Sequence, residues 1–133
     1  MDAAPRFDRI DEDSIAVLVR DFYALARRDA LLGPVFEQAV GRTDAAWTEH
    51  LLRVHAFWSS VMLATGRYGG RPMQVHAMIP GLEGAHFRRW LALFAETAGQ
   101  LFVPDLAAQF QDKADRMAAA LMQGITLVRS GAV

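Results

Sequence analysis

Two prolines, Pro72 and Pro80, restrict the middle of the chain more than any other feature of the sequence. Proline suits the first turn of an α-helix, where its missing N–H is not needed, and it disfavours helical angles in the residue before it. The seven residues between the prolines therefore predict a helix of about two turns. Within them, His76 has apolar neighbours and no acid beside it. We expect it to be either a hydrogen-bonded core histidine or a ligand to a group that enters the core.

Apolar residues recur at helical spacing through most of the remaining chain. We predict a helix capped by Asp11 or Asp13, one from residue 44 to about 65 capped by Thr43, and one from about 85 to 102. A last helix should start at Pro104. No segment has a convincing strand pattern. The predicted fold is therefore all-α, with five or six helices of unequal length.

The segment after the first predicted helix is less regular. Gly33 and Pro34 predict a turn there, because this pair breaks helices. Phe36 is too apolar for a free loop and should pack inward. Residues 1–133 are expected to form one domain, with residues 1–10 loosely ordered.

Composition excludes several classes of function. The net charge is −1 without a basic block, so nucleic-acid and membrane-surface binding have little support. The chain has no cysteine, which excludes thiolate metal sites and thiol nucleophiles. Its start resembles no targeting peptide, and no apolar run approaches the ~20 residues of a spanning helix, so a cytoplasmic protein is the default. A hydrophobic content of 53% indicates a lined pocket or a partner surface.

The predicted helix at 44–65 holds two histidines in different positions. His50 falls in the apolar arc and should face the interior, whereas His55 falls just outside the arc and should touch water. Ser59 lies on the polar side. A single core-facing histidine is more often hydrogen-bonded to a carbonyl than functional. The two histidines are five residues apart, so they cannot both reach one metal from one helix face.

Other polar groups stand close to predicted apolar faces. Tyr23 is either a rim tyrosine with its hydroxyl in water or a phenol that points into a cavity. Trp90 lies within an apolar arc, and its indole N–H needs an acceptor if it is buried. The glycine-rich loop before His76 is weak as a phosphate cradle, but Arg67, Tyr68 and Arg71 could meet an anionic group there.

Few kinds of chemistry fit these residues. No serine-hydrolase elbow or pair of catalytic carboxylates is visible. Zinc would need His50, His55, His76 and His86 to converge, yet His55 and His86 are expected at the surface. One histidine that ligates the iron of a flat, apolar haem fits better, with His50, Tyr23 and Trp90 on the opposite side. An aromatic, Met-rich core without a cofactor also explains the pattern.

Several stretches together resemble the group III truncated haemoglobins, a bacterial class with a shortened, two-over-two helical globin sandwich that encloses a haem. The matching stretches are residues 21–23, 32–36, 47–50, 57–58, 66–72, 76–80, 86–87 and 90–94. They keep their order over nearly the whole chain. The paired-glycine motifs of other truncated haemoglobins are missing, which agrees with group III.

The resemblance implies a role for individual residues. His76 matches the proximal ligand of the iron, and the haem is expected to be haem b, iron protoporphyrin IX. Arg67, Tyr68 and Arg71 are candidates for its propionates by position only. The residues that match the distal side or the haem face are Tyr23, His50, Trp90, Phe36 and Val54.

The resemblance also implies a function. We expect a monomer that binds O₂, NO and CO at iron. The hypothesis for its reaction is redox chemistry, either oxidation of NO to nitrate or turnover of peroxide, with electrons from an unidentified reductase. The alternative is a non-enzymatic sensor or binding module for diatomic ligands.

Overall fold

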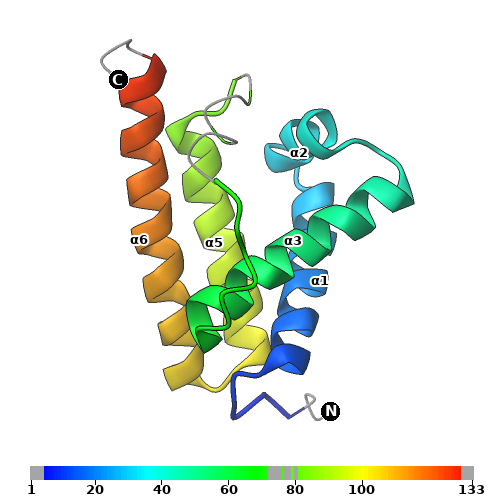
Figure 1. The fold of residues 1–133 in the computed structure, drawn as a ribbon, viewed down its shortest axis with the longest axis vertical. Helices are drawn as coiled ribbons and strands as arrows, with labels where there is room; N and C mark the ends of the chain where they lie inside the picture. The colour runs from blue at the N-terminus through cyan, green and yellow to red at the C-terminus, as the bar shows by residue number, and fades with distance from the viewer. Residues whose placement is uncertain (1–4, 72–75, 77–78, 80, 130–133) are drawn as a thin grey trace.

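The computed structural model describes residues 5–71, 76, 79 and 81–129, and within these ranges it is helical with no strand (Figure 1). Its named helices are α1 (Glu12–Arg28), α2 (Leu32–Val40), α3 (Asp44–Leu63), α5 (Gly84–Leu101) and α6 (Pro104–Arg129). His76, between α3 and α5, also has helical geometry. The all-α prediction is confirmed. None of the described helices combines the length and the hydropathy that crossing a bilayer requires.

Local capping explains where two helices begin. The Asp11 carboxylate accepts from the N–H of Ser14 at 2.8 Å, and the Ser14 hydroxyl accepts from the N–H of Asp11 at 2.9 Å. This reciprocal pair satisfies two backbone donors that the first turn of α1 leaves without helical partners. The Thr43 hydroxyl accepts from the N–H of Ala46 at 3.1 Å and starts α3. Both predicted starts are confirmed.

The predicted turn at Gly33 and Pro34 is wrong, because both residues lie in the first turn of α2. Proline is tolerated there since the first helical N–H groups have no acceptor within the helix. The Asp29 carboxylate accepts from the N–H groups of Leu31 and Leu32 and so caps this start. At Gly33 a Cβ would stand 2.7 Å from the Arg27 carbonyl oxygen, so only glycine allows α1 and α2 to approach this closely.

An aromatic stack forms the centre of the core. Phe94 of α5 is stacked between Trp58 of α3 and Trp90 of its own helix, with ring centroids 5.1 Å and 5.0 Å away and planes within 12° and 8°. Phe22 of α1 meets Phe94 edge-on at 5.6 Å. Phe110 of α6 meets Trp58 in the same way at 5.6 Å. These contacts join α1, α3, α5 and α6, and each aromatic pair adds about 0.5–1.5 kcal/mol beyond area burial.

The described residues just before α1 pair with the connection between α5 and α6. Phe7 donates its N–H to the Leu101 carbonyl at 2.7 Å and accepts at its own carbonyl from Val103 at 3.0 Å. Its ring packs on Phe102, with centroids 5.4 Å apart. This pairing ties the chain before α1 to the connection between α5 and α6. The helices α5 and α6 themselves lie side by side, as Figure 1 shows.

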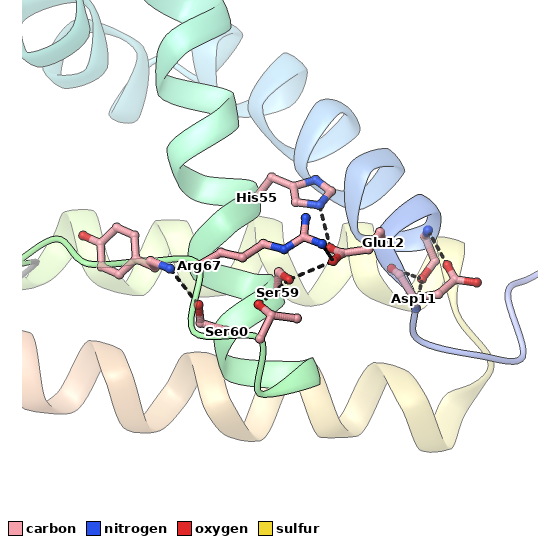
Figure 2. Close-up of polar contacts among 9 residues, drawn as sticks. Asp11, Glu12, His55, Ser59, Ser60 and Arg67 are labelled. Carbon is pink, nitrogen blue, oxygen red and sulfur yellow. Dashed lines mark hydrogen bonds and ion pairs between the residues drawn. The ribbon is translucent and has the colours of Figure 1, made fainter.

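A polar cluster centred on Glu12 joins α1, α3 and the loop after α3 (Figure 2). The Glu12 carboxylate lies 2.9 Å from His55 Nε2, 3.1 Å from the Ser59 hydroxyl and 3.0 Å from the Arg67 guanidinium. Ser59 is fully buried, which corrects its prediction as a surface residue. Its hydroxyl has partners inside the fold, because it donates to Glu12 and also bonds Thr65 at 2.8 Å.

The Glu12 cluster predicts a pH-dependent part of the stability. The pKa of Glu12 is held below its usual range. The hydrogen bond with His55 contributes most to this lowering, and the hydrogen bond with Ser59 and the positive charge of Arg67 add to it. A lowered carboxyl pKa stabilises the fold above the pKa of the unfolded chain, and this stabilisation is lost as the pH falls through the folded value. We expect Glu12→Gln to lower the melting temperature at pH 7, with the difference from wild type vanishing well below about pH 4.

Thermal melts followed by circular dichroism between neutral and acid pH test this. Glu96→Gln is the matched control, because Glu96 is an exposed carboxylate on α5. A gap between wild type and Glu12→Gln that stayed constant down to the lowest pH would show that the charge of Glu12 contributes no stability.

Candidate functional site

A cavity of about 390 Å³ lies beside the aromatic stack. Every named helix contributes to its lining, together with Tyr68, His76, Ile79 and Leu82. The volume lies within the roughly 300–1,000 Å³ typical of small-molecule sites. Aliphatic and aromatic side chains make most of its wall, so the cavity suits a large apolar group. Phe36 and Val54, both predicted to face such a group, are among the lining residues.

One side of the cavity presents His76. This histidine is half-buried and lines the cavity together with Ile79, Leu82 and Phe87. The Phe87 ring centroid is 6.4 Å from that of His76. The His76 carbonyl accepts a hydrogen bond from the N–H of Ile79 at 3.1 Å. His76 therefore presents an imidazole among apolar side chains, and a second imidazole, that of His86 next to Phe87, also lines the cavity. The remaining parts of the Pro72 to Pro80 prediction lie outside the described residues.

His50 enters the cavity from α3, as its periodicity predicts. Its ring is surrounded edge-on by Tyr23 and Trp47, with centroids 5.1 Å and 5.3 Å away. Burial, and then the positive fields of Arg53 and His76, lower the pKa of His50 to about 4, so the imidazole is neutral at pH 7. Within the part of the chain that the structure describes, its buried Nε2 has no hydrogen-bond partner.

An unsatisfied buried polar atom costs about 1–3 kcal/mol, so its presence needs an explanation. His50 Nε2 lies in a residue that lines the cavity, and a polar ligand held there would satisfy it. The buried Nε2 without a partner therefore favours a cavity that binds a polar group over a closed, apolar core.

Tyr23 and Trp90 form a polar pair in the same cavity lining. Tyr23 is 7% exposed, and burial raises the pKa of its phenol far above the usual range, while a hydrogen bond with Trp90 opposes that shift. An indole N–H can only donate, so in this interaction Trp90 is the donor and the Tyr23 oxygen the acceptor. The phenol proton then remains available for another acceptor. Of the two alternatives for Tyr23, the structure shows the phenol at a cavity.

The three predicted anion partners before His76 separate in the structure. Tyr68 lines the cavity, its ring packs edge-on to Phe57 at 5.3 Å, and its N–H donates to the Ser60 hydroxyl at 2.9 Å. Arg67 turns instead to Glu12, as Figure 2 shows. Arg71 is exposed and is not among the residues that line the cavity.

Several polar lining residues were missed by the sequence reasoning. Glu49 and Arg53 of α3 form an ion pair with each other and border the cavity, although helical spacing assigns both to the polar side. His86 was expected to be exposed, but it is half-buried and lines the cavity. Its Nδ1 accepts from the Glu83 N–H at 3.0 Å at the start of α5. The sequence does carry a signal for this local bond, because His86 stands three residues after Glu83, which is the spacing of a capping box at a helix start.

The arrangement fits a planar, apolar cofactor that takes one imidazole on one face. His76 supplies the imidazole, and the aromatic and aliphatic wall supplies the apolar contacts. Elsewhere in the lining, Tyr23 offers a donor, and His50 offers a nitrogen with no partner among the described residues, to a small polar ligand. These donors can stabilise negative charge on that ligand.

Comparison with known proteins identifies the family. No protein-family model matches the chain. The group 3 truncated haemoglobin of Campylobacter jejuni is 33% identical to it over 113 residues, which cover 85% of this chain and 89% of the relative. A crystal structure of group III truncated haemoglobin from Campylobacter jejuni matches with a TM-score of 0.88 and 30% identity, over 91% of this chain and 95% of that one. The predicted truncated-globin fold is confirmed, and the chain belongs to the group III truncated haemoglobins.

Proposed function

We propose that this protein binds haem in the cavity, with His76 as the axial ligand, and holds a diatomic ligand on the side of Tyr23 and His50. The observation that supports this proposal is the cavity, whose mainly apolar lining includes His76 and also the buried Nε2 of His50, which has no hydrogen-bond partner among the described residues. Haem iron, when bound, supplies a coordination site for O₂, NO or CO and electrons for redox chemistry.

His76 would hold the haem through the lone pair of one ring nitrogen. Ile79, Leu82 and Phe87 line the cavity with it and exclude water from that bond. Leu82 is buried, at 8% exposure. The hydrophobic shell around a metal site controls solvent access and the local dielectric, so these three side chains tune the strength of the bond.

Tyr23 and Trp90 act as one donor unit on the opposite side. Because the Trp90 indole donates to the Tyr23 oxygen, it orients the hydroxyl and makes it a stronger donor. A hydrogen bond to a charged group contributes about 1.5–3 kcal/mol. Such a bond from Tyr23 to a ligand with partial negative charge slows its release roughly ten- to a hundredfold. Retention of this size is poorly suited to an O₂ carrier.

His50 contributes without a positive charge. Its pKa of about 4 keeps the ring neutral at physiological pH. Nε2 can donate or accept there, depending on the tautomer, and so it can contact either end of a polar diatomic molecule. His50 therefore adjusts ligand binding by a neutral hydrogen bond rather than by electrostatic attraction.

The two carboxylates of haem b need partners at the rim. Tyr68 and Arg53 both border the cavity, and Arg53 carries a positive charge there. Neither Arg67 nor Arg71 lines the cavity, whereas Arg53 does so while it is paired with Glu49. We therefore assign the carboxylates to Arg53 and Tyr68 in preference to the two arginines of the loop.

The reaction that the strong donors favour is oxidation of NO. One O₂, one NO and one electron from a reductase give one nitrate, so the site must retain O₂ until NO arrives. Peroxide turnover is a second redox candidate with the same need for an external reductant. A ligand sensor would also retain its bound diatomic ligand, but it would not consume NO repeatedly. Repeated consumption of NO with a chemical reductant present supports catalysis, and a single turnover that is never repeated supports sensing.

The assignment of His76 predicts a specific loss. His76→Ala should remove the axial bond and weaken haem retention, and added imidazole should restore the ferrous absorption spectrum. His55→Gln is the control, since His55 bonds Glu12 and does not line the cavity. Retention of the spectrum by His76→Ala, with its loss in His50→Ala, would reverse the two sides of the site.

The donor pair predicts a change in ligand release. Tyr23→Phe should raise the O₂ dissociation rate roughly ten- to a hundredfold, because the phenol hydrogen bond is lost. Trp90→Phe should raise it less, and the double variant should show less than the sum because Trp90 acts through Tyr23.

Stopped-flow displacement of O₂ by CO measures these rates. His55→Gln is the control, because His55 bonds Glu12 and does not line the cavity. Strictly additive effects of Tyr23→Phe and Trp90→Phe would contradict a coupled pair.

A further inference from the structure

The last residue of α6 contacts the backbone that follows His76. The Arg129 guanidinium donates to the Leu82 carbonyl at 2.5 Å and to the Ile79 carbonyl at 2.7 Å. Ile79 in turn donates its N–H to the His76 carbonyl at 3.1 Å. A continuous chain of hydrogen bonds thus connects the end of α6 to the peptide group of His76, across 53 positions of sequence.

The contacted residues have side chains at the cavity. Ile79 and Leu82 both line it beside His76, so Arg129 holds the backbone of the same wall through its carbonyl oxygens. Between the two carbonyls, Gly81 has a φ of 74°, which lies in the left-handed region that glycine adopts without strain. The backbone turns sharply at this point, and the two carbonyls that Arg129 bridges stand on either side of the turn.

Helix α6, which carries Arg129, is itself held in place by a buried apolar face. Ala118, Leu121 and Ile125 are buried along one of its faces, and Leu121 also lines the cavity. Leu121 and Arg129 lie eight residues apart, which is about 12 Å along a helix. The same rigid helix therefore contacts the cavity directly and, two turns further on, the backbone next to His76.

Arginine suits this task better than lysine. Its planar guanidinium presents donors in a fixed fork, so two carbonyls can be held at a set separation. Lysine provides a point charge on a flexible stem and cannot fix two acceptors in the same way. A cation in the last turn also stabilises its own helix, and that simpler role would be served by either residue.

We propose that Arg129 is a positioning residue for His76. By holding the carbonyls of Ile79 and Leu82 against α6, it sets the orientation in which the His76 imidazole enters the cavity. This inference rests on the proposed function, in which His76 ligates haem iron. Arg129 is outside the cavity lining and takes no part in the chemistry itself.

The test compares three variants of the haem-reconstituted protein. Arg129→Met removes the bridge and the charge, whereas Arg129→Lys keeps the charge and removes the fork. Arg116→Met is the matched control, because Arg116 is an exposed arginine of the same helix, paired with Asp112 at 3.3 Å. The readouts are the iron–imidazole stretching band of the ferrous form, the rate of haem transfer to an acceptor globin, and the melting temperature of the haem-free chain.

We expect both Arg129 variants to shift or broaden the stretching band and to speed haem transfer roughly tenfold or more, because Arg129→Met removes two charge-assisted hydrogen bonds and Arg129→Lys at least one. Arg116→Met should match wild type. A wild-type band in Arg129→Met would overturn the proposal, as would full rescue by Arg129→Lys, which would assign Arg129 to the helix end alone. Faster haem transfer with an unchanged band and a lower melting temperature would also overturn it.

His76→Ala separates this inference from the proposed function. If His76→Ala keeps the stretching band, His76 is not the iron ligand and both proposals fail. If His76→Ala abolishes the band while the Arg129 variants leave it unchanged, only the role of Arg129 fails.

Discussion

The stack of Phe94 between Trp58 and Trp90 is the interaction on which the rest of the structure depends. Phe94 is 1% exposed and belongs to the solid core, whereas both tryptophans also line the cavity. The stack therefore separates the buried hydrophobic core from the cavity. It fixes the Trp90 indole at the place where its N–H meets Tyr23, so the packing of four helices determines the geometry of one polar pair.

The cavity offers contacts that a bound group would use. Its apolar walls offer dispersion contacts, and the buried Nε2 of His50, which has no partner among the described residues, offers a polar contact. A planar apolar group would make the first kind of contact, and a polar ligand on it would make the second. Because such a group binds only the folded chain, it stabilises the fold by mass action. Binding and stability are thus two results of the same arrangement.

Local signals in the sequence predicted much of the fold, and distant contacts limited the rest. Asp11 and Thr43 cap their helices through residues three positions away, so their role is visible without a structure. The turn predicted at Pro34 failed because proline is equally suited to a turn and to the first turn of a helix. Periodicity brought His50 to the interior correctly. It misplaced Ser59, whose burial depends on Glu12, a partner 47 residues away.

We have proposed that His76 and Tyr23 face opposite sides of one haem, and a crystal structure of the haem-reconstituted protein with CO bound would test this arrangement. We predict a His76 ring nitrogen at bonding distance from the iron. The Tyr23 hydroxyl should lie within hydrogen-bond distance of the CO, with Trp90 donating to Tyr23. A structure in which His50 ligates the iron, or in which the haem lies outside the cavity, would contradict the claim.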